Sequence, residues 1–219
     1  MMLAEEGKLS VSDPITKFLP DYPTQGRTIT VEHLLTHTSG IQSYTDMPKW
    51  RGMLRQDISL AELVDLFKSE PMQFAPGEKW RYNNSGYILL GAIIEKVSGK
   101  KYADFVRERI FDPLGMSQTR YDVTGEVIAR RAAGYGKTGD RFVNAQYLSM
   151  TQPYAAGALL STAEAYRVSA RMSFASHPTA STSRCCRTSP RPPRMCRRSR
   201  ARPRPSPSAS LSSTRRWWR

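Results

Sequence analysis

The composition of this 219-residue chain changes abruptly after Glu164, and that change limits where a fold can form. The last 55 residues contain 14 Arg, 12 Ser and 7 Pro, but only three residues of the types Leu, Ile, Val and Phe. A segment in which these four types supply well under about 20% of residues cannot bury enough apolar surface to offset the entropy cost of ordering its backbone. We therefore expect residues 1–164 to form the folded domain and residues 165–219 to be a disordered Arg/Ser/Pro-rich tail.

The positive charge of the chain is confined to the same tail. The formal net charge is +14, from 33 basic and 19 acidic residues. The tail holds 14 Arg and no acidic residue, so residues 1–164 carry equal numbers of bases and acids. A domain without net charge has no long-range field to attract phosphate, which excludes a uniformly basic nucleic-acid-binding domain.

Two interpretations of the tail remain open. Its arginines and the terminal Trp217 and Trp218 are typical of a segment that binds RNA or lies on a membrane surface, which would make the protein a nucleic-acid-binding protein acting through its tail. The other interpretation is a frameshift, because the change occurs within a predicted helix and a GC-rich gene read out of frame yields this mixture of residues. We favour the frameshift.

Membrane spans, metal sites and cofactors are not predicted. The longest apolar run, at 87–94, is far shorter than the ~18 residues that cross a bilayer. The first residues show no secretory signal, so the compartment stays open: cytoplasmic by default, or periplasmic or secreted for a longer parent protein. All three cysteines lie in the tail without a Cys-x-x-Cys spacing, which predicts neither a disulfide nor structural zinc.

Apolar residues at helical spacing predict four helices between residues 30 and 115. A capping residue precedes the first two and a glycine or proline follows each helix. The predicted helices begin after Thr30 and end near Gly40, run from Ser59 to Pro71, run from Ser85 to Ser98, and run from Tyr102 to about Ile110. The signals weaken over 124–152, where four glycines indicate loops and short strands.

Several ordered motifs resemble the serine β-lactamase-like family, which includes class C β-lactamases, D-alanyl-D-alanine carboxypeptidases and related esterases. The resemblance runs from about residue 3 to residue 164. It rests on Leu-Leu-Thr-His-Thr-Ser-Gly-Ile at 34–41, Phe-Ala-Pro-Gly at 74–77, Tyr-Asn-Asn-Ser-Gly-Tyr-Ile-Leu-Leu-Gly at 82–91 and Asp-Pro-Leu-Gly-Met at 112–116. It implies an α+β fold of the β-lactamase/transpeptidase type, of which this chain supplies mainly the helical part.

The resemblance also implies acyl transfer from a small-molecule β-lactam, peptide or ester through a serine. Tyr82 and Asn84 match the family's Tyr-x-Asn motif, so we expect Tyr82 to be catalytic and Asn84 to bind substrate. A phenol with a pKa near 10 acts as a base only beside a cation, and an amide side chain can orient a substrate amide. The alternative is that both residues only begin the helix, with Asn84 as its N-cap.

The family's Ser-x-x-Lys motif is missing where it should be. In the family it precedes the segment that resembles residues 6–10, so we expect this chain to be an inactive fragment that lacks its nucleophile. A literal copy at Ser98–Lys101 follows Tyr82 and lies at a glycine-stopped helix end, and Lys137-Thr138-Gly139 copies a third family motif within the glycine-rich region. We interpret both as coincidental, the second as a solvated turn.

Two further candidates near residue 37 are not favoured. His33 and His37 lie four residues apart, but a zinc-protease helix carries a glutamate between its histidines, and no third ligand cluster follows. Ser39 lacks the Gly-x-Ser-x-Gly elbow that exposes a nucleophile.

Because a fragment without several sheet strands leaves apolar surface uncovered, we also expect marginal stability and aggregation.

Overall fold

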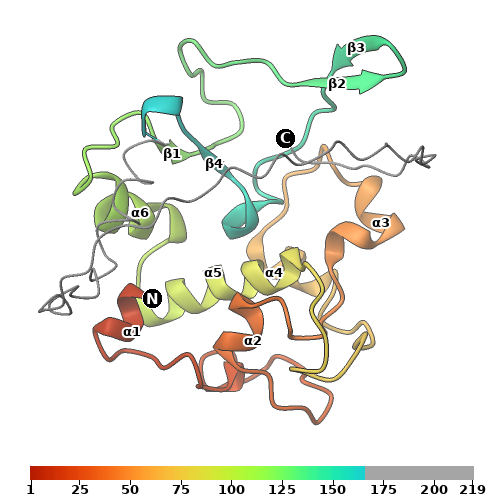
Figure 1. The fold of residues 1–219 in the computed structure, drawn as a ribbon, viewed down its shortest axis with the longest axis vertical. Helices are drawn as coiled ribbons and strands as arrows, with labels where there is room; N and C mark the ends of the chain where they lie inside the picture. The colour runs from red at the N-terminus through yellow and green to blue at the C-terminus, as the bar shows by residue number, and fades with distance from the viewer. Residues whose placement is uncertain (166–219) are drawn as a thin grey trace, which may run out of the picture. The chain divides into compact units, whose positions relative to one another are not determined.

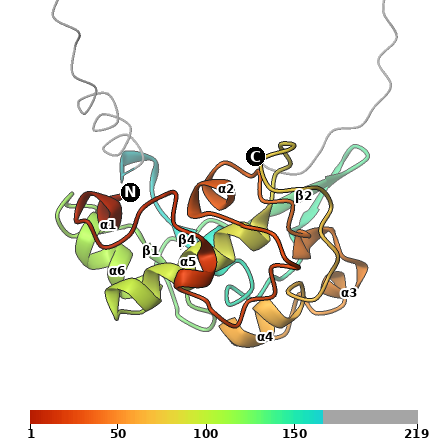
Figure 2. The same ribbon diagram turned by 90° about the horizontal axis from the view of Figure 1, so that it is seen from below.

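The computed structural model describes residues 1–165, and α5 (Asn84–Ser98) runs through the middle of them (Figures 1 and 2). Packed against α5 are α1 (Met2–Glu5), α2 (Val31–Leu35), α4 (Leu60–Asp65), α6 (Tyr102–Val106) and the short helical turns η2 (Tyr44–Asp46) and η4 (Tyr154–Ala156). The other helical elements are η1 (Ile15–Lys17), α3 (Pro48–Arg51) and η3 (Arg107–Phe111). The tail predicted over 165–219 lies, apart from Ala165, outside the described residues, and its boundary stays a prediction.

The sequence of α5 explains both its ends and its burial. Asn83 in extended conformation accepts a hydrogen bond from the Gly86 N–H, and Gly99 ends the helix with φ of 70°, a left-handed conformation that glycine adopts without strain. Ile88, Leu89 and Ile93 are almost completely buried. A helix that is apolar on most faces is stable only inside such a cluster.

The predicted caps of the two earlier helices are confirmed. The Thr30 side chain accepts from the His33 N–H, and Ser59 and Glu62 form a reciprocal capping box, which satisfies amide groups that helix ends leave unpaired. Helix α4 ends at Asp65, six residues before the Pro71 that was predicted to end it, and turns continue the chain from there. Helix α6 is likewise shorter than predicted, because a wider turn of helix, η3, replaces its second half.

The strands of the described region pair only two at a time. β1 (Arg120–Tyr121) pairs antiparallel with β4 (Leu159–Leu160), and β2 (Tyr135–Thr138) with β3 (Arg141–Asn144) in a hairpin that projects from the helices (Figure 1). The mixture of helices and short strands confirms the α+β class. No helix within residues 1–165 is long and apolar enough to cross a membrane.

Candidate active site

Tyr82 and Asn84 lie together at the N-terminal end of α5. Tyr82 is in the extended segment before the helix, and its side chain is 50% exposed. Asn84 is the first residue of the helix and only 9% exposed. The structure therefore presents an accessible phenol beside a nearly buried amide, at a helix end whose backbone N–H groups favour negative charge.

The N-cap of α5 is Asn83, so the alternative in which Asn84 caps the helix is wrong. The Asn83 Oδ1 accepts from the Gly86 N–H at 3.0 Å, and its Nδ2 donates to the Ile41 carbonyl. Asparagine is a favourable N-cap residue, so residue type alone does not decide between Asn83 and Asn84. The bond from the Asn83 Nδ2 to the Ile41 carbonyl, 42 positions away, selects Asn83. Asn84 is thereby relieved of a capping role.

Two hydroxyls of the segment before α3 hold Asn84. Its Nδ2 donates to the Thr45 Oγ1 at 3.0 Å, and its backbone N–H donates to the Ser43 Oγ at 3.3 Å. The two hydroxyls also bond to each other at 3.0 Å. With Nδ2 directed at Thr45, the Asn84 Oδ1 is the atom that can accept a hydrogen bond from an incoming amide.

Buried side chains fix the same segment to the helix. The Ser85 hydroxyl donates to the Gln42 carbonyl at 2.8 Å and accepts from the Tyr44 N–H at 2.9 Å. Burial raises the pKa of Tyr44 well above 10, and its hydroxyl donates to the Gln152 carbonyl at 2.8 Å. Tyr44 is therefore a neutral structural phenol, and Tyr82 is the accessible one.

Three aromatic rings, one of them that of Tyr82, pack against His37, which lies two residues after α2. The ring centroid of Tyr82 lies 4.8 Å from that of His37, with 43° between the planes. His37 also stacks on Tyr87 at 5.1 Å and meets Trp80 edge-on at 6.2 Å. The adjacent Arg81 forms an ion pair with Asp46 at 3.1 Å, so its charge is already engaged.

The literal Ser-x-x-Lys copy lies at the opposite end of α5. The helix has fifteen residues, which places Ser98 roughly 21 Å from Asn84 along the axis at 1.5 Å per residue. The Ser98 hydroxyl donates to the Ile94 carbonyl at 2.6 Å, Lys101 lies 3.7 Å from Glu95, and Lys100 pairs with Glu108. These groups cannot meet Tyr82.

The second copy, at 137–139, is exposed to solvent as predicted, but only its last residue lies in a turn. Lys137 and Thr138 belong to β2, and Gly139 is in the turn of the hairpin with φ of 58°. Every residue of the two strands except Gly136 is exposed. The two short strands agree with the loops and short strands that the glycines over 124–152 indicate.

The two histidines near this site hold different loops. The His33 Nδ1 accepts from the Thr30 N–H and the His37 Nδ1 accepts from the Asn83 N–H, each at 3.2 Å. Among residues 1–165 no three His, Cys, Asp or Glu side chains are grouped as a metal site.

The sequence analysis did not identify Thr45 and Ser43, the residues that hold Asn84. The only signal for them was a short stretch of polar residues after Gly40.

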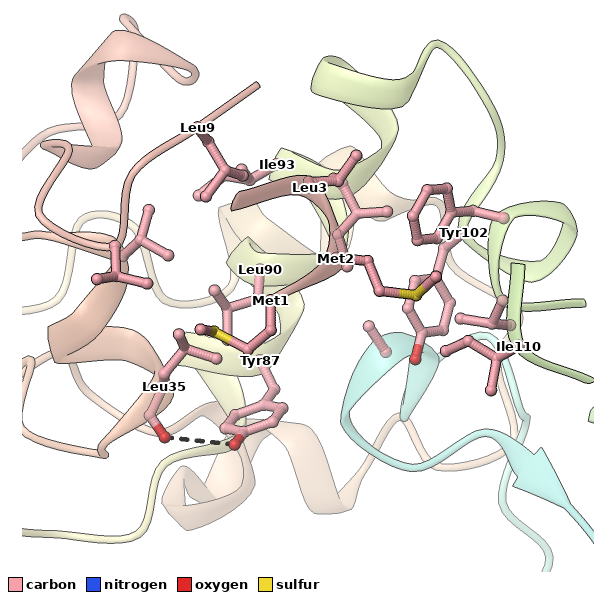
Figure 3. A pocket seen from close by; sticks show the side chains of 17 residues that line it. Met1, Met2, Leu3, Leu9, Leu35, Tyr87, Leu90, Ile93, Tyr102 and Ile110 are labelled. Atoms are coloured by element: carbon pink, nitrogen blue, oxygen red, sulfur yellow. Dashed lines mark hydrogen bonds between the residues drawn. The ribbon is translucent and has the colours of Figure 1, made fainter. Parts of the chain in front are cut away.

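An apolar cavity of about 280 Å³ lies between α1, α2, α5 and α6 (Figure 3). Its walls include Leu35, Leu90 and Ile110, and the Tyr87 hydroxyl at its edge donates to the Leu35 carbonyl at 3.3 Å. Neither Tyr82 nor Asn84 lines it. Among the described residues that line it there is no serine and no lysine, and Tyr87 and Tyr102 are the only ones with a polar side chain.

Comparison with known proteins gives consistent matches. The model of the family described as Beta-lactamase matches residues 1–184. Penicillin-binding protein 4* of Bacillus subtilis is 42% identical over 127 residues, which are 55% of this chain and 27% of that protein. The putative penicillin-binding protein PbpX of the same organism is 35% identical over 157 residues, 72% of this chain and 38% of that protein.

The solved structures agree with the sequence relatives. The D-amino acid amidase from Ochrobactrum anthropi SV3, complexed with L-phenylalanine, superposes with a TM-score of 0.69 at 32% identity, over 80% of this chain and 50% of that one. The chain thus spans between 27% and 38% of the length of these two curated relatives and half of the amidase chain.

Proposed function

Because the chain belongs to the beta-lactamase family, we propose that Tyr82 and Asn84 are half of an acyl-transfer site. In such a site a serine oxygen attacks the carbonyl carbon of a β-lactam, a D-alanine peptide or an ester, and the bond to the leaving nitrogen or oxygen breaks. The observation that carries the proposal is the pairing of an exposed phenol with an amide that is fixed by Thr45 and free of the capping role.

Tyr82 is the proton carrier of the proposed site. Its oxygen takes the proton of the attacking serine and later gives a proton to the leaving group, as general acid–base catalysis requires. A phenolate forms near neutral pH only beside a cation. The neighbouring Arg81 is paired with Asp46, so the proposal requires a lysine ammonium from the nucleophile's motif.

Asn84 is the substrate-orienting group. Its Nδ2 bond to Thr45 leaves the Oδ1 to accept from an N–H of the substrate, next to the bond that is cleaved. Acceptors of this kind discriminate strongly against ligands that lack the donor, because the buried partner is then unpaired. Ligands with an amide beside the reacting carbonyl are therefore favoured over simple esters.

We further propose that the 219-residue chain alone does not form an acyl-enzyme. The serines around the site are buried: Ser39, Ser43 and Ser85 are each at most 2% exposed. Ser43 and Ser85 are also hydrogen-bonded to the segment that holds Asn84. Ser98 lies at the far end of α5. None of these hydroxyls is placed to attack a carbonyl that contacts Tyr82.

Noncovalent binding of benzylpenicillin tests the proposed site. In ¹⁵N-resolved NMR of the full chain, benzylpenicillin should shift the side-chain amide of Asn84, and 6-aminopenicillanic acid, which lacks the acylamino group, should shift it less. Asn84→Ala should weaken binding about tenfold or more, the cost of one buried hydrogen bond. Asn144→Ala, at an exposed position of β3, is the matched control. Equal binding by the two variants would refute the assignment of Asn84.

The nucleic-acid alternative is not favoured. It rests on the arginine-rich residues 165–219, which apart from Ala165 lie outside the described part of the chain, and the family match gives it no support.

A further inference from the structure

His37 contacts the loop that carries Tyr82 at three consecutive residues. Its carbonyl accepts from the Arg81 N–H at 2.9 Å, its ring packs on the Tyr82 ring at 4.8 Å, and its Nδ1 accepts from the Asn83 N–H at 3.2 Å. The residues on both sides of Tyr82 are therefore hydrogen-bonded to His37: Arg81 to its backbone carbonyl and Asn83 to its side chain.

The backbone of His37 is held in a costly conformation. Its φ of 60° is left-handed, which is unfavourable for a residue with a Cβ and persists only where the surroundings enforce it. The turn after α2 supplies such surroundings, because the Thr38 N–H donates to the His33 carbonyl at 2.9 Å and Gly40 is also left-handed. If His37 only packed against its neighbours, an apolar aromatic residue with a right-handed or extended backbone could fill the same place.

The bond to Asn83 requires an unprotonated Nδ1, since an imidazolium has no acceptor. The phenols of Tyr82 and Tyr87 face the ring. The charged groups of the same loop are in ion pairs, Arg81 with Asp46 and Lys79 with Glu78, and on α2 the His33 Nδ1 accepts from Thr30. Within residues 1–165 no carboxylate pairs with His37, and burial lowers the pKa of its imidazole.

We propose that neutral His37 is a positioning residue, which holds the Tyr82 phenol in the orientation that proton transfer requires and releases it on protonation. The inference rests on the proposed function of Tyr82. It adds that the site loses its geometry as pH falls through the titration of His37, even where the rest of the fold persists.

A pH titration of the full chain by NMR tests the inference without any variant. The Asn83 amide proton and the Tyr82 ring signals should shift with one midpoint, equal to that of the His37 ring protons and below pH 6.5. The Tyr82 ring signals are assigned by their loss in Tyr82→Phe. Signals of Asn83 and Tyr82 that stay constant across the His37 midpoint would overturn the inference.

Two variants separate the ring from the acceptor. His37→Phe keeps an aromatic ring and removes the acceptor, whereas His37→Asn tolerates left-handed backbone and keeps an acceptor. We expect the Asn83 amide to lose its pH dependence in both and its hydrogen-bonded downfield shift in His37→Phe. His33→Phe, which removes the equivalent bond to Thr30, is the control and should leave the Tyr82 signals at their wild-type positions.

Benzylpenicillin separates failure of the inference from failure of the proposed function. If the site is as proposed, affinity should fall about threefold to tenfold below the His37 midpoint, and His37→Asn should bind with no such pH step. Absence of binding at every pH would refute the proposed function alone, because the signals of Asn83 and Tyr82 report His37 without ligand. If benzylpenicillin bound with no pH step and the Tyr82 ring signals did not change with the titration of His37, the inference would be wrong and His37 would have only a packing role.

Discussion

Replacing the two adjacent asparagines at the start of α5 by alanine should lower the stability of the fold by different amounts, Asn83→Ala more than Asn84→Ala. Asn83→Ala removes the acceptor for the Gly86 N–H and the donor to the Ile41 carbonyl. Loss of an N-cap costs about 1 kcal/mol, and a buried carbonyl left unpaired costs about 1–3 kcal/mol. Ile41 is 4% exposed, so both costs apply and the free energy of unfolding should fall by about 2–4 kcal/mol.

In Asn84→Ala the free energy of unfolding should fall by only about 1 kcal/mol, since the variant loses the bond to Thr45 while the cap stays intact. Asn83→Asp should be intermediate, because it keeps the acceptor and adds a charge that the helix N-terminus favours, but loses the donor to Ile41. Urea unfolding followed by circular dichroism measures these differences. If Asn84→Ala were the more destabilising variant, the assignment of the cap and of the free amide would both be wrong.

Three further changes test the packing and the site. Gly91→Ala should lower the free energy of unfolding by about 1–3 kcal/mol, because a Cβ there would lie 2.4 Å from the Tyr154 ring; a melting temperature equal to wild type would contradict this. Thr45→Val should shift the Asn84 side-chain amide and cost about 1 kcal/mol, whereas Thr45→Ser, which keeps the hydroxyl, should restore the wild-type spectrum. The lowered pKa of His37 means that the unfolded chain binds more protons between that pKa and 6.5, so stability should rise with pH across this window. Urea midpoints at several pH values should show this rise in wild type and not in His37→Asn.

The helix starts were predictable because their signals are local. Thr30 and Ser59 bond within three residues of themselves, so the sequence around each contains the whole interaction. The choice between Asn83 and Asn84 was not predictable, because a carbonyl 42 residues away decides it. The end of α5 was also predictable, because Gly99 marks it, whereas α4 stops at Asp65, before any proline or glycine that could have marked its end.

The candidate site shows the same difference between what nearby residues indicate and what contacts between distant residues decide. Tyr82 and Asn84 were predicted from the resemblance that several ordered motifs carry together, whereas the side chains that hold them come from the segment 37–45 and depend on the fold. Tertiary contacts of this kind leave no periodicity in the sequence. The expectation of marginal stability remains a prediction, and the exposure of Phe142 at 76% and Tyr135 at 65% in the two-stranded hairpin supports it, since such hairpins are weak alone.

In the proposed function, Tyr82 and Asn84 hold the substrate side of an acyl-transfer site, and no serine of this chain acts as its nucleophile. Mass spectrometry of the intact chain after incubation with a fluorescent penicillin tests it most directly, at a concentration where NMR shows the Asn84 amide to be perturbed. We predict that the mass stays that of the unmodified chain. An added acyl group on a serine of this chain, Ser98 included, would contradict the account.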